Sequence, residues 1–115
     1  MKALVTGGTG FIGSRVVEIL LKEGHSVRLF SRRKTLPEQL KNKAVEMFPG
    51  DLESPESIIP AMKGVDVFYH IGEIKNTTRS ASAKNVRLME RILENLDAET
   101  RLVFISSITV AGIPS

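Results

Sequence analysis

Three glycines near the N-terminus stand at a spacing that suits the binding of a phosphate group. Gly7, Gly10 and Gly13 follow a short apolar run at 3–5 and lead into a segment with helical periodicity. The first glycine lets the chain turn sharply out of a strand, the second lets backbone N–H groups approach a pyrophosphate, and the third lets the helix pack closely on the strand. The partial positive charge of the helix N-terminus then faces the phosphates. We therefore interpret the stretch as a dinucleotide-binding turn; an ordinary glycine-rich turn is the alternative. The residues expected to contact the cofactor are Gly7, Gly10, Phe11, Ile12 and Gly13.

A basic stretch, Ser31-Arg32-Arg33-Lys34, follows the second apolar run of the chain. A site selective for NAD places an Asp or Glu here, where it bonds the ribose 2′-hydroxyl. This chain has no carboxylate from 31 until Glu38, and it offers two guanidinium groups whose planar forks suit a 2′-phosphate. Arg32 and Arg33 therefore predict a preference for NADP(H) over NAD(H). A solvated basic loop is the alternative.

These groups need a scaffold of alternating strands and helices. The apolar runs predict strands at 2–6, 26–31, 44–48, 65–71 and 102–107. The helical patterns predict helices at 11–23, 54–64 and 81–96, and a short one at 36–40. The expected buried faces are Ile12, Val16, Ile19 and Leu20 in the first helix, Ile58, Ile59 and Met62 in the second, and Ala83, Val86, Met89, Ile92, Leu93 and Leu96 in the long one. Strand–helix alternation indicates an α/β fold with right-handed crossovers.

The stretch T-G-G-T-G-F-I-G at residues 6–13 resembles the extended or atypical short-chain dehydrogenase/reductase family, which includes NAD-dependent epimerases and dehydratases. The resemblance covers essentially the whole chain. It implies an open, doubly wound, Rossmann-like parallel sheet with strand order 3-2-1-4-5, truncated before the sixth strand. It also implies one dinucleotide-binding domain over 1–115, incomplete relative to the family.

The same resemblance implies further site residues. Asp51 and Leu52 match the family's G-D-L stretch beside the adenine, where the aspartate accepts from the exocyclic amine; a turn or helix-cap role is the alternative for Asp51. Ile71 and Gly72 match the strand end that lies close to the cofactor, and His70 before them is interpreted as a packed residue. Ser107 aligns with the catalytic Ser or Thr, with a serine satisfied by backbone as the alternative. Glu73 and Ala111 depart from the family pattern.

The catalytic Tyr-x-x-x-Lys pair of such enzymes is missing from this sequence. The only tyrosine is Tyr69, and four residues later comes Glu73 rather than lysine. The favoured hypothesis is the NADP(H)-binding portion of an oxidoreductase or epimerase that acts on a hydroxyl- or carbonyl-bearing metabolite. A non-catalytic NADP(H)-binding redox sensor or partner module is the second hypothesis, and a generic mononucleotide-binding domain is the third.

Composition bounds the remaining possibilities. The 115 residues are 42% apolar and 25% charged, as in an ordinary globular domain, with no cysteine and a net charge of +3. The absence of cysteine fits a cytoplasmic protein, and the sequence predicts neither a membrane span nor a metal site. Scattered basic residues and few aromatics argue against nucleic-acid binding. The apolar run 102–105 would form the edge of the sheet, so the expected outcomes are a homodimer paired through this edge, a swap of C-terminal segments or poor solubility.

Overall fold

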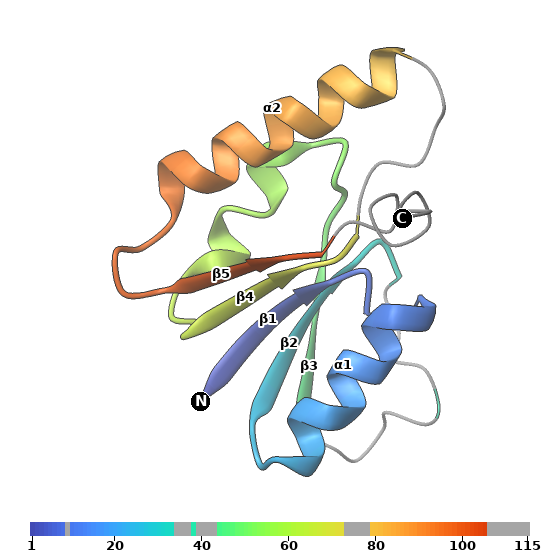
Figure 1. Ribbon diagram of the computed structural model, residues 1–115, viewed down its shortest axis with the longest axis vertical. Coiled ribbons are helices and arrows are strands. Elements are labelled where there is room, and N and C mark those ends of the chain that lie inside the picture. The colour runs from blue at the N-terminus through green and yellow to red at the C-terminus, as the bar shows by residue number, and fades with distance from the viewer. Residues whose placement is uncertain (9, 34–37, 39–43, 73–78, 106–115) are drawn as a thin grey trace, which may run out of the picture.

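The chain folds into a five-stranded parallel sheet with helices on both faces (Figure 1). A computed structural model describes residues 1–8, 10–33, 38, 44–72 and 79–105. The strands are β1 (Lys2–Thr6), β2 (Ser26–Ser31), β3 (Val45–Pro49), β4 (Val67–His70) and β5 (Arg101–Phe104), in the spatial order β3-β2-β1-β4-β5. The helices are α1 (Phe11–Lys22) and α2 (Arg79–Asn95), with two 3₁₀ turns, η2 (Pro55–Ser57) and η3 (Pro60–Met62). The predicted strand order 3-2-1-4-5 is confirmed.

The sheet has its topological switch point at β1, where the strand order reverses although all strands are parallel. The chain proceeds from β1 outward through β2 to β3, then crosses back to lay β4 against the other side of β1. In open α/β sheets the crevice at such a reversal, outside the carboxyl ends of the strands, is where ligands bind. The carboxyl ends of β1 and β4 are paired through Thr6 and His70, so the residues that follow them meet at this crevice.

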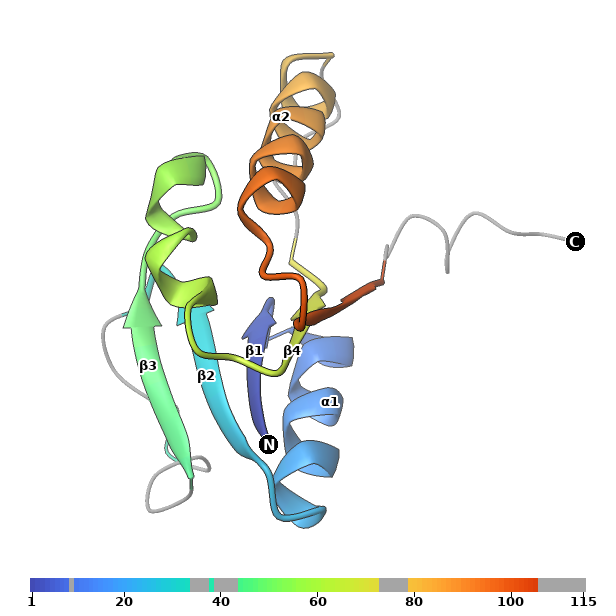
Figure 2. The same cartoon turned by 90° about the vertical axis from the view of Figure 1, so that its left-hand side faces the viewer.

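Two apolar layers hold the sheet, one under each set of helices. Figure 2 shows α1 on one side of the strands, with α2 and the turns η2 and η3 on the other. Under α1 the core consists of Ala3, Val5, Val17, Leu20, Val27, Leu29, Val67 and Ile71. On the opposite face it consists of Leu4, Phe30, Ile58, Ala61, Met62, Val65, Phe68, Leu88 and Ile92. Alternate residues of β1 thus enter opposite layers, as the two-residue period of a strand requires.

The α-helix predicted over 54–64 is wrong: this stretch forms the separate turns η2 and η3. Pro60 lacks the N–H that would bond back to residue 56, which interrupts an α-helical ladder. The Ser57 hydroxyl donates to the Ser54 carbonyl at 2.7 Å, and the Ile58 N–H bonds to the Pro55 carbonyl at 3.2 Å in a tight 3₁₀ pattern. Ile58 and Met62 are buried as expected, whereas Ile59 is half-buried.

The buried faces of both long helices differ in part from those expected. In α1, Val17 is fully buried while Ile19 is 55% exposed. In α2, Val86 and Leu93 are 60% and 56% exposed, and the buried row runs through Leu88 and Ile92. The predicted stripes combined neighbouring rows of apolar residues, and the contact with the sheet selected one row in each helix. No helix in the described part of the chain has both the length and the apolar character needed to cross a membrane.

Candidate functional site

The turn after β1 is built from glycine because another backbone segment passes directly against it. Gly7 has a φ of 71°, in the left-handed region. A Cβ on Gly7 would lie 2.6 Å from the backbone nitrogen of Gly72, at the end of β4. Gly72 is equally constrained, since a Cβ there would lie 2.9 Å from the Gly7 nitrogen. The two glycines therefore let the ends of β1 and β4 touch backbone to backbone at the point where the strand order reverses.

The first turn of α1 packs on the turn that leads from Gly7 to Gly10, which is called the glycine turn below. The Gly10 N–H donates to the Gly7 carbonyl at 3.1 Å, and Gly10 serves as the helix N-cap without a side-chain capping bond. A Cβ on Gly13 would lie 1.8 Å from the Gly7 carbonyl oxygen, so only glycine fits. No acidic residue lies in the first turn of α1. The helix N-terminus can therefore present backbone N–H groups to an anion, which is the chemistry that the glycine spacing predicts.

A buried threonine ties the two strand ends together. The Thr6 hydroxyl oxygen accepts hydrogen bonds from the N–H groups of Ile71 and Gly72, both at 3.0 Å. Its proton then has one remaining partner, Nδ1 of His70 at 2.8 Å, so the neutral ring carries its own proton on Nε2. The sequence interpretation did not single out Thr6; its place at a strand end directly before Gly7 was the available signal.

His70 is a packed residue, as expected, and it is held neutral. Its side chain is 4% exposed and lies between the rings of Phe68 and Phe104, at centroid distances of 5.7 and 5.6 Å. Burial lowers the pKa of His70 from 6.5 to about 4. A neutral ring is what the Thr6 hydroxyl requires, because a protonated Nδ1 would no longer accept its hydrogen bond.

The buried state of His70 should make the protein acid-sensitive. Between pH 6.5 and about 4 the unfolded chain binds a proton at this residue and the folded chain does not. The free energy of unfolding should therefore fall by about 3 kcal/mol as the pH decreases through this window, and His70 should add no further loss below it. Urea unfolding across this range measures the slope. At pH 6.5, His70→Gln should be less stable than the parent, and its free energy of unfolding should fall less steeply as the pH decreases. An equal fall in both proteins would contradict the lowered pKa of His70.

The basic residues lie at the carboxyl end of β2, next to the glycine turn. The Ser31 hydroxyl accepts the Arg33 N–H at 3.1 Å, and the Ser31 carbonyl accepts the Gly50 N–H at 2.9 Å. These bonds fix the backbone where it leaves the strand, and the side chains of Arg32 and Arg33 are exposed. Because β2 pairs with β1 in parallel, with Phe30 opposite Thr6, both arginines follow β2 at the same carboxyl end of the sheet where Gly7 follows β1.

The segment after β3 reaches the same crevice. A Cβ on Gly72 would lie 3.3 Å from Cδ1 of Leu52, so Leu52 lies beside the glycine turn. The Asp51 carboxylate accepts the Glu53 N–H at 2.9 Å, which is a turn-capping role. The Ser57 hydroxyl, which sequence reasoning missed, accepts the Asp51 N–H at 3.1 Å. The role of Asp51 toward an adenine amine stays a prediction.

The remaining predicted site residues are placed only in part. Ile12 is half-buried against the core under α1, and the Ile71 side chain belongs to that core, so Ile71 can offer a ligand mainly its backbone. Phe11 begins α1. Ser107, Glu73 and Ala111, and the predicted helix at 36–40 apart from Glu38, lie outside the described residues. The described structure thus brings the following predicted site residues together at the carboxyl ends of the strands: Gly7, Gly10, Gly13, Arg32, Arg33, Asp51, Leu52, Ile71 and Gly72.

Known proteins are similar in sequence to this chain. The 3-beta-hydroxysteroid dehydrogenase of Mycolicibacterium neoaurum is 32% identical over 103 residues, which cover 89% of this chain and 27% of that protein. Sterol demethylase protein B of Methylococcus capsulatus is 44% identical over 70 residues, which cover 61% of this chain and 21% of that protein. The chain thus spans only about a fifth to a quarter of the length of these curated relatives.

A solved structure agrees with the fold. A short-chain dehydrogenase/reductase superfamily protein from Agrobacterium tumefaciens, solved with bound NAD, is 30% identical and superposes with a TM-score of 0.74. The match covers 96% of this chain and 34% of that chain. Residues 3–115, which are nearly the whole chain, match the sequence model of one family. This match agrees with the glycine turn and the strand order, and the chain belongs to the NAD-dependent epimerase/dehydratase family.

Proposed function

We propose that this chain is the NADP(H)-binding portion of an oxidoreductase or epimerase that acts on a hydroxyl- or carbonyl-bearing metabolite in the cytoplasm. The observation that carries the proposal is the backbone contact between Gly7 and Gly72, with the α1 N-terminus packed on it through Gly13. This contact removes side chains from the crevice at the strand reversal, where a pyrophosphate meets free N–H groups. A nicotinamide dinucleotide is the cofactor class supported by the family.

The preference for the phosphorylated cofactor rests on this chain's own residues. The Agrobacterium relative was solved with NAD, so the likeness does not select NADP(H). Arg32 and Arg33 are exposed at the end of β2, where the ribose of a cofactor seated on the glycine turn would lie. The proposal is tested by titration calorimetry with NADPH and NADH. Tighter binding of NADPH supports it, equal affinities remove the preference, and no binding of either cofactor overturns the proposed function.

When bound, the cofactor would exchange a hydride with a substrate carbon. The chain's own contribution is positional: the glycine turn and the α1 N-terminus hold the pyrophosphate, and Arg32 and Arg33 hold the 2′-phosphate. Ser107 would hydrogen-bond a substrate carbonyl or hydroxyl. No tyrosine–lysine pair is present to move the proton, since Tyr69 is half-buried in β4 and the residue four positions later is Glu73.

The second candidate, a non-catalytic NADP(H)-binding module, is favoured by Glu73 and Ala111, which depart from the family pattern. We expect the chain by itself to bind NADPH but to give no steady hydride transfer with a panel of ketones and aldehydes. Loss of NADPH absorbance above the buffer rate, abolished by Ser107→Ala, would show that the proton has another carrier. A Tyr-x-x-x-Lys pair encoded beyond residue 115 would favour the enzyme over the binding module.

We also propose that copies of this chain associate through the edge of the sheet at β5. In the described part of the chain, β5 pairs only with β4, and Phe104 is 48% exposed. Such an edge offers unpaired backbone groups and apolar surface to a second copy.

The variant Phe104→Lys is expected to convert a dimer into a monomer, because a charge on the edge opposes strand pairing. Ile105→Lys is a poorer test, since Ile105 packs against the core under α1. Phe104 contacts the ring of His70, so the melting temperature of Phe104→Lys is measured together with its mass. Sedimentation at about 100 μM measures the change. The matched control is Ile19→Lys, which alters a side chain 55% exposed on α1 and should leave the dimer intact. A parent protein that sediments as a soluble monomer would contradict the proposal.

A further inference from the structure

The segment 50–57, which carries Asp51 and Leu52, is closed into a loop by its own hydrogen bonds. The Ser57 hydroxyl accepts the Asp51 N–H at 3.1 Å and lies 2.9 Å from the Asp51 carbonyl and 2.7 Å from the Ser54 carbonyl. At one end, the Gly50 N–H donates to the Ser31 carbonyl at 2.9 Å, which ties the loop to β2. The loop therefore moves as a unit, and its position relative to the crevice depends on what holds its other end.

Burial holds the loop at Leu52, which packs half-buried against the core on that face of the sheet, and at Ile58, the fully buried residue directly after the loop. None of the three residues of η2 is buried, and the Glu56 side chain is 71% exposed. The outer face of the loop, which carries Glu53 and Glu56, therefore depends on polar contacts with a neighbouring element.

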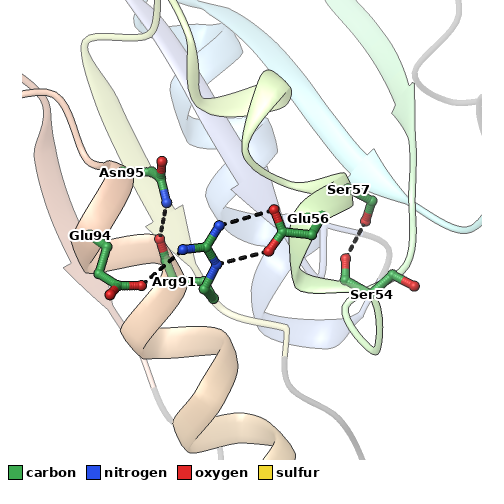
Figure 3. Close-up of polar contacts among 6 residues, drawn as sticks. All are labelled: Ser54, Glu56, Ser57, Arg91, Glu94 and Asn95. Carbon is green, nitrogen blue, oxygen red and sulfur yellow. Dashed lines mark hydrogen bonds and ion pairs between the residues drawn. The ribbon is translucent and has the colours of Figure 1, made fainter.

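Helix α2 supplies those contacts at two points. The Arg91 guanidinium binds Glu56 through two bonds, Nε to Oε1 at 2.8 Å and Nη2 to Oε2 at 3.0 Å (Figure 3). Two helical turns earlier, Lys84 Nζ lies 3.0 Å from Oε1 of Glu53. Arg91 also binds Glu94 on its own helix at 3.1 Å, an exposed contact within α2. A bidentate arginine–carboxylate pair has a defined geometry that a single exposed contact lacks.

The helix is a firm support for these two contacts. Leu88 and Ile92, which lie between and beside the two basic residues, are fully buried in the core on that face of the sheet. The clamp, defined as the pairs Lys84–Glu53 and Arg91–Glu56, thus connects a helix anchored on the sheet to the outer face of a loop whose inner contacts are made by Gly50, Leu52 and Ile58. Leu52 lies within the clamped loop, next to Gly72 and the glycine turn.

We propose that Arg91 and Lys84 are positioning residues for the adenine side of the cofactor site, acting through Glu56 and Glu53 on the loop that carries Asp51 and Leu52. The inference rests on the proposed function and extends it. Neither basic residue touches the cofactor. Their effect is to hold the loop in the geometry that the adenine meets, so that the cofactor does not have to order the loop when it binds.

The test measures binding of NADPH and of adenosine 2′,5′-bisphosphate, a probe of the adenine half, by titration calorimetry. Arg91→Glu places a third carboxylate beside those of Glu56 and Glu94, and we expect both ligands to bind about three- to tenfold more weakly. The swapped pair Arg91→Glu/Glu56→Arg should restore both affinities to within about twofold of the parent. The control Glu94→Gln removes only the contact within α2 and should leave both affinities nearly unchanged.

A second readout needs no cofactor. Amide hydrogen exchange at Asp51 and Glu53, whose N–H groups close the loop, should be faster in Arg91→Glu than in the parent and should return in the swapped pair. A merely structural role would lower the melting temperature while leaving the affinities and these amides unchanged, and that result overturns the inference. If the parent binds neither ligand, the proposed function fails and the inference fails with it. If the parent binds and Arg91→Glu binds equally well, only the clamp is refuted.

Discussion

Replacement of Gly13 by alanine is expected to abolish dinucleotide binding and to lower the free energy of unfolding by about 3 kcal/mol or more. The new Cβ would lie 1.8 Å from the Gly7 carbonyl oxygen and 2.9 Å from Cα of Gly8, both of them backbone atoms that cannot rotate away. Helix α1 would have to shift off the turn, and its N-terminal N–H groups would move with it. Urea unfolding measures the loss of stability, and calorimetric titration with NADPH measures the loss of binding.

The matched control for this variant is Gly10→Ala. Among the residues that the structure describes, a Cβ on Gly10 would meet only the Gly7 carbonyl oxygen, at 3.4 Å, which is an ordinary contact. This variant should therefore fold with nearly the parent's stability while binding NADPH more weakly, because the new methyl group lies where the pyrophosphate approaches. Equal stabilities of the two variants would contradict the clash expected at Gly13. A Gly10→Ala protein that binds NADPH as tightly as the parent would show that the turn is only structural.

The double variant Arg32→Ala/Arg33→Ala is expected to lose NADPH affinity while keeping its affinity for NADH. Each arginine–phosphate contact contributes about 1.5–3 kcal/mol, so the loss should be about tenfold to 150-fold for one contact and greater for two. Titration of both cofactors against the parent and the variant gives the change in their ratio.

Two comparisons make that result specific. Arg15→Ala removes an arginine of α1 that is paired with Glu18 on the same helix, and it should change neither affinity. Repetition at raised ionic strength should weaken NADPH binding to the parent more than to the double variant, because salt screens exposed charges. Unchanged NADPH affinity in the double variant would mean that the basic stretch is a solvated loop, which was the alternative interpretation of the sequence.

Features that depend on residues close together in the sequence could be predicted from the sequence. The strands at 2–6 and 26–31 have the predicted bounds, and the strand order follows from the alternation of strands and helices together with the family resemblance. The glycine turn was predictable because the left-handed backbone of Gly7 and the packing of Gly13 on Gly7 are requirements within a few residues, whereas the contact of Gly7 with Gly72 is not local. The described residues of the candidate site lie at the carboxyl ends of β1, β2, β3 and β4, and their role toward a cofactor stays a prediction.

Local pattern was insufficient wherever several solutions had similar local energies. The apolar residues of α2 form adjoining rows, and only contact with the sheet decided that Leu88 is buried while Val86 and Leu93 are exposed. The stretch from 54 to 64 carries a helix-like pattern, but a proline at 60 and a hydroxyl at 57 favour two short 3₁₀ turns.

The sequence by itself determined the strands and the position of the glycine turn, because these depend on residue types within one turn or one strand, and the strand order was implied by the family resemblance. Only the tertiary structure decided that Thr6 would bond to His70, 64 residues away, and that Arg91 would clasp Glu56, 35 residues away. Such contacts depend on the register between strands and on the rotation of α2 about its axis. A hydroxyl, an imidazole or a guanidinium has many potential partners along a chain, and packing of the apolar layers selects the one that lies within reach.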